Sequence, residues 1–102
     1  MDEKIYSLLG LCQKAGKLVC GEFSVENAIK SGTALVVLIS LDASENTKKK
    51  FHDKCDFYNV KVADFGSKEK LGHAIGKEVR TSVAVTDAGF AKSLCEKLEL
   101  QL

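Results

Sequence analysis

The unbroken apolar run Ala34–Ser40 constrains the fold of this chain more than any other feature. A strand with one face in water alternates apolar and polar residues, but this run has no polar member before its last residue. The run therefore predicts a central strand over residues 34–40 that other elements cover on both faces.

The remaining hydrophobic pattern alternates between strand and helix signals. Further strands are predicted over residues 17–20, 60–65 and 82–86. Helices are predicted over residues 3–14, up to Ser31-Gly32, after the cap-rich segment 41–47, from the N-cap Ser67 to Gly76, and at the C-terminal end. Their inward-facing residues include Val25, Ala28 and Ile29; Phe51, Cys55 and Tyr58; Leu71, Ala74 and Ile75; and Phe90, Leu94 and Leu98. This alternation predicts an α/β sandwich with helices on both faces of a short sheet.

Length and composition favour one globular domain over residues 1–102. The apolar fraction of 45% is ordinary and excludes a disordered chain. There are 15 Lys plus Arg residues against 14 Asp plus Glu residues, so the net charge is +1. This balance excludes a strongly basic, histone-like polymer binder, and the partner must be inferred from local patterns.

We expect a cytoplasmic protein without membrane contact. Asp2 and Glu3 stand where a signal peptide carries basic residues, and the apolar run 34–39 is too short to span a bilayer. The chain has four cysteines: Cys12, Cys20, Cys55 and Cys95. They are too far apart for CxxC pairs, which predicts buried, reduced thiols and no metal. A metal or redox site is the alternative, and it requires His52 or His73 nearby.

No pattern of catalytic residues emerges. The glycines form neither GxGxxG nor GxxxxGK[ST], and neither His52 nor His73 adjoins a nucleophile in a known arrangement. Asp42 and Asp87 follow buried strands, which is a favoured active-site position, but helix N-capping explains both better. We therefore predict no enzyme and no cofactor. An enzyme that uses Asp42 or Asp87 is only the third hypothesis.

Positive charge gathers at several turns. The groups are Lys14, Lys17 and Lys30; Lys48–Lys50; and Lys77 with Arg80. The segment Gly21–Ser24 places the start of a helix, with free backbone amides, beside the first group. Helix N-termini bind phosphate groups, so this segment favours a nucleic-acid partner over a purely solvated lysine face.

A joint spacing of several segments points to a known family. The segments are Gln13–Val19 followed by Gly21 and Gly32, Ala34–Ala43, Leu71–Gly76, and Ser82–Asp87. Together they resemble the kink-turn RNA-binding ribosomal protein family of the seven-Ae and thirty-e type, and Asp42–Lys48 with Gly89–Lys92 resembles its short bacterial branch. The resemblance implies a three-layer α/β/α sandwich with a mixed four-stranded sheet. It also implies a monomer that binds structured RNA, either rRNA or another noncoding RNA, with ribosomal proteins as further partners.

The resemblance also implies which residues contact RNA. In the family the second helix begins Gly-x-Asn-Glu-x-x-Lys and reads sheared G·A pairs, whereas the corresponding positions here are Phe23, Ser24 and Asn27. A second family contact, an apolar loop against flipped-out bases, maps to Lys77–Thr81, where Val79 is apolar. Phe23 either stacks on an unpaired base or packs in the core, and both alternatives remain open.

The leading hypothesis is a noncatalytic RNA-binding protein with one continuous binding surface. Its predicted residues are Gly21, Glu22, Phe23, Ser24, Asn27, Lys30, Asp42, Ala43, Lys48, Lys77, Glu78, Val79, Arg80 and Thr81. The second hypothesis is a protein-interaction module on the same fold, which no longer binds RNA and in which Phe23 anchors a protein.

Overall fold

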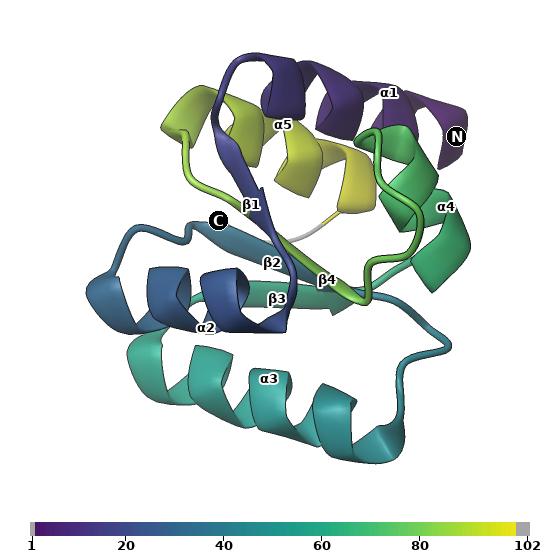
Figure 1. The fold of residues 1–102 in the computed structure, drawn as a ribbon. Helices are drawn as coiled ribbons and strands as arrows, with labels where there is room; N and C mark the ends of the chain where they lie inside the picture. Colours follow the sequence, from purple (N-terminus) through teal and green to yellow (C-terminus); the bar gives the residue numbers. More distant parts are fainter. Residues whose placement is uncertain (1, 100–102) are drawn as a thin grey trace.

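The computed structural model describes residues 2–99, in which helices and strands alternate without exception (Figure 1). The helices are α1 (Asp2–Lys14), α2 (Glu22–Ser31), α3 (Glu45–Tyr58), α4 (Lys68–Ala74) and α5 (Ala88–Leu98). The strands are β1 (Leu18–Cys20), β2 (Val36–Ile39), β3 (Lys61–Asp64) and β4 (Ser82–Val85). Every predicted helix and strand is present, and each strand is shorter than predicted.

The four strands form one mixed sheet in the order β1-β4-β2-β3. Strand β4 is antiparallel to both of its neighbours, and β3 is parallel to β2. In this register Val36 lies opposite Val85 on one side and Lys61 on the other. The mixed four-stranded sheet that the family resemblance implies is therefore confirmed.

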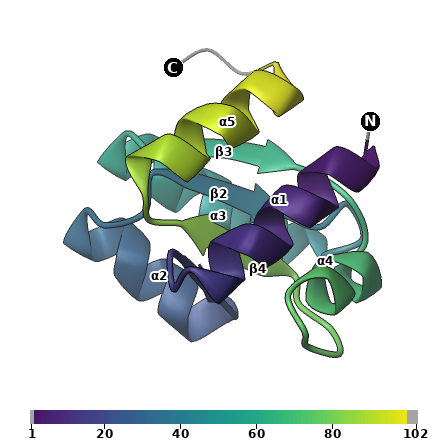
Figure 2. The same cartoon turned by 90° about the horizontal axis from the view of Figure 1, so that it is seen from above.

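Helices cover both faces of the sheet (Figures 1 and 2). Helices α1, α4 and α5 lie on one face, and α2 and α3 lie on the other. Successive residues of β2 serve the two layers, because Val36 and Leu38 pack toward the first set of helices and Val37 and Ile39 toward the second. These layers confirm the predicted three-layer α/β/α sandwich.

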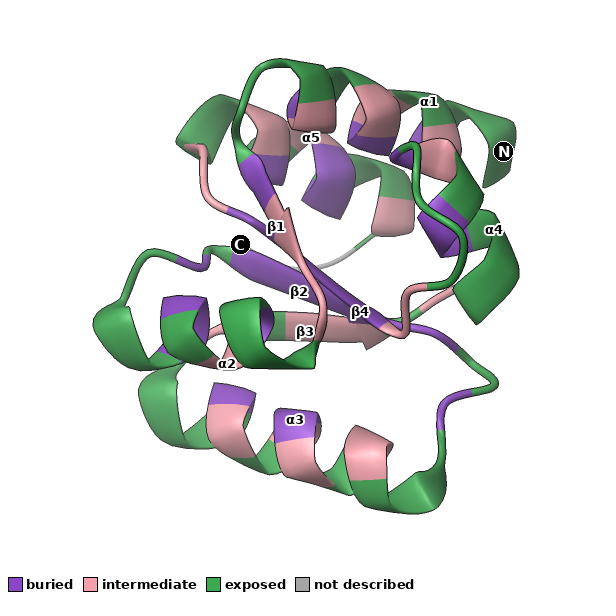
Figure 3. Cartoon of the chain, viewed as in Figure 1, coloured by how far each residue is buried: buried purple, intermediate pink, exposed green. Residues whose placement is uncertain are grey.

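Burial explains why the central run is uniformly apolar. All residues of β2 and β4 are buried, while β3, at the edge, is partly exposed (Figure 3). A strand with helices on both faces has no wet side on which a polar residue is favoured. The prediction of a covered central strand is confirmed for Val36–Ile39.

Some side chains predicted to face the core are less buried. Tyr58 is 41% exposed, because α3 ends there and Asn59 (φ 58°) turns the chain away toward β3. The prediction that Tyr58 belongs to the apolar side of α3 is therefore wrong. Ala74, Phe90 and Leu98 are half-buried at the margin of the core.

The topology gathers several loops at one end of the sheet, where three of its strands finish. Strands β1, β2 and β3 run in the same direction, so the chain leaves all three at this end and enters the antiparallel β4 there. Helices α2, α3 and α4 begin at the same end of the sheet (Figure 1). We call this surface the loop platform and define it as residues 21–24, 40–44, 65–68 and 77–82.

Candidate nucleic-acid interface

Backbone hydrogen bonds join the loops of the platform into one surface. They run from Gly21 N to Ser82 O (3.0 Å), from Ser40 N to Thr81 O (2.9 Å), from Leu41 N to Gly66 O (2.8 Å) and from Arg80 N to Lys68 O (2.9 Å). Each bond links two segments that are distant in sequence. The platform therefore holds its shape through the backbone and leaves most of its side chains available for a partner.

The start of α2 is open to an anion. Gly21 is its N-cap, at φ 91° and ψ 152°, and no side chain of the described residues caps the helix there. The first amides of a helix lack intrahelical partners and lie at the positive end of the helix dipole. Phe23 is 77% exposed, which excludes the alternative that it packs in the core. Ser24 and Asn27 are both exposed on the first two turns.

The start of α3 is closed by its own cap. The Ser44 hydroxyl accepts a hydrogen bond from Thr47 N at 3.1 Å. Ala43 is buried, so it offers a partner no more than its backbone, and Lys48 in the first turn is 3.9 Å from the Glu45 carboxylate. Leu41 is 59% exposed at the end of β2.

The two strand-end carboxylates act as helix caps. Asp42 Oδ1 accepts a hydrogen bond from Lys68 N at 2.9 Å, so it caps α4 across the platform. This bond is the main reason that the pKa of Asp42 lies below its usual value. Asp87 Oδ2 accepts from Phe90 N at 3.0 Å and caps α5. The capping interpretation is therefore confirmed, although Asp42 caps a different helix from the one that follows it.

The loop between α4 and β4 is held close to α4. A Cβ atom at Gly72 would lie 2.7 Å from the Glu78 carbonyl oxygen, so only glycine allows this approach. Val79 is 45% exposed at the loop surface. The Arg80 guanidinium donates to Val79 O (2.6 Å) and to the half-buried Cys20 sulfur (3.4 Å), which fixes its direction.

Most lysines on α2 and α3 are held in ion pairs. The Glu26 carboxylate forms ion pairs with Lys30 (3.3 Å), Lys50 (3.0 Å) and Lys54 (3.2 Å). These contacts, with Lys50 foremost, lower the pKa of Glu26 to about 2. Lys50 also reaches Glu22 at 3.2 Å.

The predicted single surface is therefore correct only in part. Lys30 lies in the last turn of α2, at the opposite end of that helix from Gly21, and its inclusion in one surface with the platform is wrong. Helices α2 and α3 each follow a strand that ends at the platform. Their N-termini therefore lie at the platform, and their C-termini lie away from it. Leu41 and Lys68 belong to the platform and were missed. The Ser67 cap was a signal for Lys68, since the first residue of a helix follows its cap directly.

The cysteines and histidines form no shared centre in the described part of the chain. Burial raises the pKa of Cys12 and of Cys55 to about 11, and it also raises the pKa of Cys95. Burial is confirmed for these three thiols and wrong for Cys20. Within residues 2–99, no three His, Cys, Asp or Glu side chains are grouped to hold a metal ion. Helices in the same range are too short or too polar to cross a membrane.

Comparison with known proteins gives the family. Residues 3–95 match the model of the ribosomal protein L7Ae/L30e/S12e/Gadd45 family. RNA-binding protein YlxQ of Bacillus subtilis is 47% identical over 94 residues, which cover 92% of this chain and 94% of that protein. The YlxQ protein of Enterococcus faecium is 39% identical over 97 residues, which cover 95% and 93% of the two chains.

A solved structure gives the same answer for the fold. A protein of unknown function from Bacillus halodurans superposes with a TM-score of 0.90 at 42% identity, over 94% of this chain and 97% of that one. The family match covers nearly all of the described residues and agrees with the resemblance found in the sequence. This chain therefore belongs to the ribosomal protein L7Ae/L30e/S12e/Gadd45 family.

Proposed function

We propose that this chain is a noncatalytic protein that binds structured RNA of the kink-turn type through the loop platform. One observation carries the proposal: a single end of the sheet combines an uncapped helix N-terminus, exposed apolar side chains and cations that have no carboxylate partner among residues 2–99. Family membership and the name of the YlxQ relatives support RNA as the partner. The RNA is rRNA or another noncoding RNA, bound by a monomer in the cytoplasm.

Phosphate groups fit the open start of α2. Backbone amides there point outward, and the helix dipole favours negative charge at this end. Glu22 in the same turn would oppose a phosphate, but Lys50 holds its carboxylate at 3.2 Å. Lys77 and Arg80 add positive charge from the neighbouring loop, and such contacts release counterions from RNA.

Unpaired bases fit the apolar side chains of the platform. Structured RNA exposes bases at loops and bulges, and proteins recognise them by stacking. Phe23 offers a free aromatic face, and Leu41 and Val79 offer apolar contacts from the two other loops. This arrangement replaces the hydrogen-bonding residues that the family pattern has at the start of α2.

Titration with two RNAs tests the proposal. We expect wild-type protein to bind a kink-turn RNA more tightly than a plain duplex of equal length. Phe23→Ala should weaken kink-turn binding by roughly five- to hundredfold, because one stacked base contributes about 1–3 kcal/mol. Phe57→Ala is the matched control, since Phe57 is also an exposed helical phenylalanine (78%) but lies in the last turn of α3, away from the platform.

Two outcomes would contradict the proposal. Equal affinity for the kink-turn and the duplex would exclude recognition of the kinked structure. A folded Phe23→Ala protein with unchanged RNA affinity would favour the protein-interaction module, in which Phe23 anchors a protein.

A further inference from the structure

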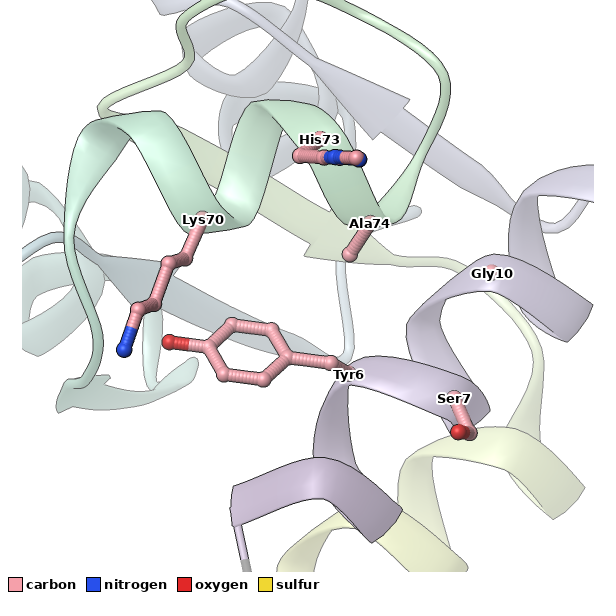
Figure 4. Close-up of a pocket in the computed structure, with 6 residues that line it drawn as sticks. All are labelled: Tyr6, Ser7, Gly10, Lys70, His73 and Ala74. Carbon is pink, nitrogen blue, oxygen red and sulfur yellow. The ribbon is translucent and has the colours of Figure 1, made fainter.

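A strip of surface hollows follows the outer side of α4. The first hollow lies between Glu69, His73 and Lys77 and reaches Val79 of the platform. The last, of about 410 Å³, lies between α4 and α1 and is lined by Lys70 and His73 of α4 and by Tyr6 and Ser7 of α1 (Figure 4). His73 lines both hollows, so the strip is continuous from the platform to α1.

The floor of this strip is rigid. Helices α1 and α4 approach so closely that a Cβ atom at Gly10 would lie 3.0 Å from the Ala74 carbonyl oxygen. Tyr6 reaches from α1 toward α4, with its hydroxyl beside the Lys70 amine (Figure 4). Its ring packs on Phe65 at a centroid distance of 5.2 Å. The groups along the strip are therefore held in place before any partner binds.

The charges along the strip favour an anionic partner. Residues 67–81 carry four cations, Lys68, Lys70, Lys77 and Arg80, against the two carboxylates Glu69 and Glu78. Within residues 2–99, no carboxylate oxygen lies within 4.0 Å of any of these four cations. Lys70 and Lys77 are exposed and thus free to meet phosphate groups.

A neighbouring acidic hollow limits where an RNA backbone can pass beside Lys70. On the β3 side of Lys70, an adjoining hollow is lined by the carboxylates Asp2, Asp42 and Asp64 and includes the platform residues Leu41 and Ser67. These carboxylates disfavour an RNA backbone in that part of the platform. Glu69 and Glu78 line the first hollow of the strip, whereas the hollow toward Ser7 and Gly10 of α1 is lined by no carboxylate of the described residues.

We propose that the strip along α4, from Lys77 past His73 and Lys70 to Tyr6 and Ser7, is a second contact for the RNA sugar-phosphate backbone. It receives phosphates of a helix that flanks the element bound at the platform. The inference rests on the proposed function, because its continuity with the platform identifies the partner as the same RNA. Amine, imidazole and hydroxyl groups are the donors that phosphate oxygens accept from.

Two RNAs of different length test the inference. The core RNA contains only the kink-turn, and the extended RNA carries one flanking helix lengthened by a turn, with each flank extended in a separate molecule. We expect wild-type protein to bind one extended RNA several-fold more tightly than the core RNA. Lys70→Gln with His73→Gln should remove this gain. It should also flatten the salt dependence for the extended RNA by about 0.9 in log–log slope for each phosphate that the variant no longer neutralises.

The matched control is Lys92→Gln. Lys92 is an exposed lysine on α5, and Figure 2 places α1 between α5 and α4. This control removes one charge from the same layer and should leave both affinities unchanged. Protection of the Lys70 amine from acetylation by the extended RNA, but not by the core RNA, checks the contact in the unmodified protein.

Failure of the strip inference and failure of the platform proposal give different results. If wild-type protein binds the core RNA but gains nothing from either extension, the strip is not an RNA contact and the platform proposal stands. Equal weakening of core and extended RNA by the double variant also overturns the strip, because the contact would then not involve a flanking helix. If wild-type protein binds neither RNA, the proposed function itself is wrong.

Discussion

The two sides of the platform differ in how their positive charges are used. Helices α2 and α3 carry five lysines and five carboxylates, and most of these lysines are ion-paired. The segment 67–81 has only four cations, yet within residues 2–99 none has a carboxylate oxygen within 4.0 Å of its charged nitrogens. The comparison teaches that the density of lysines in a sequence does not show which of them are free to meet a phosphate group, because ion pairs in the folded chain decide it.

Helix packing explains the difference. Helices α2 and α3 lie side by side, so Glu22 and Glu26 of one meet Lys50 and Lys54 of the other. Helix α4 packs instead on α1, where the close approach is made by Gly10 and no carboxylate of the described residues lines the hollow between the two helices. Its cations therefore remain available.

The largest expected effect comes from removing the unpaired cations of the platform. Lys77→Ala with Arg80→Ala should weaken kink-turn binding at least about hundredfold, because each charged hydrogen bond that is removed costs about 1.5–3 kcal/mol. Lys49→Ala with Lys54→Ala removes the same charge from the paired side and should change affinity less than about threefold, since Asp53 and Glu26 already neutralise these lysines. Titration with RNA at fixed salt measures both affinities. Equal losses of affinity in the two double variants would contradict the difference between paired and unpaired lysines.

A smaller effect is expected from closing the space between α4 and its loop. Gly72→Ala places a methyl group against the backbone of Glu78 and Val79, at 2.7 and 2.8 Å. Overpacking of this kind costs about 1–3 kcal/mol, which lowers Tm by at least about 4 °C for a chain of this size. Gly89→Ala, whose nearest neighbour is a side-chain oxygen at 3.3 Å, is the control for thermal unfolding. An unchanged Tm and RNA affinity for Gly72→Ala would show that the loop is not held by α4.

The paired side predicts a pH-dependent stability. The pKa of Glu26 falls from an ordinary 4.5 to about 2 on folding, so its ion pairs stabilise the protein above pH 4.5. This contribution disappears as the pH falls from 4.5 toward about 2. The difference in Tm between wild type and Glu26→Gln should therefore be largest near neutral pH and vanish at the acidic end of that window, with Glu96→Gln as the exposed control. Added salt should reduce the difference.

The smallest effect is expected at an exposed pair on α3. Lys49 and Asp53 are 2.9 Å apart, but both side chains are mostly exposed. Such i,i+4 pairs contribute about 0.3–0.5 kcal/mol. Lys49→Gln should thus leave RNA affinity unchanged and lower Tm only slightly. A large loss of RNA binding would indicate that the RNA interface includes α3 and would contradict the platform proposal.

The fold was largely predictable because its signals are local. The run Ala34–Ser40 requires cover on both faces, and the caps Ser44, Ser67 and Asp87 mark where three helices begin. Alternation of the elements then leaves few arrangements besides the observed sandwich.

The site was less predictable because it depends on distant contacts. Lys50 is neutralised by Glu22, which lies 28 residues away, and no local pattern reveals that pair. Helix periodicity likewise could not show that Tyr58 stands where α3 leaves the core. The place of Lys30 at the far end of α2, in contrast, follows from the helix predicted to end at Ser31-Gly32. Phe23 was ambiguous in the sequence because an exposed and a buried aromatic residue at a helix start have the same spacing.

The position of β4 has a consequence for synthesis on the ribosome. This strand is the last of the described strands but lies between β1 and β2, which do not pair with each other. A nascent chain that stops before Ser82 therefore lacks the strand that joins the two parts of its sheet, and it also lacks one wall of the platform. Folding and competence for RNA binding should arise together, only after Val85 has left the exit tunnel, so that no partly made protein occupies an RNA site.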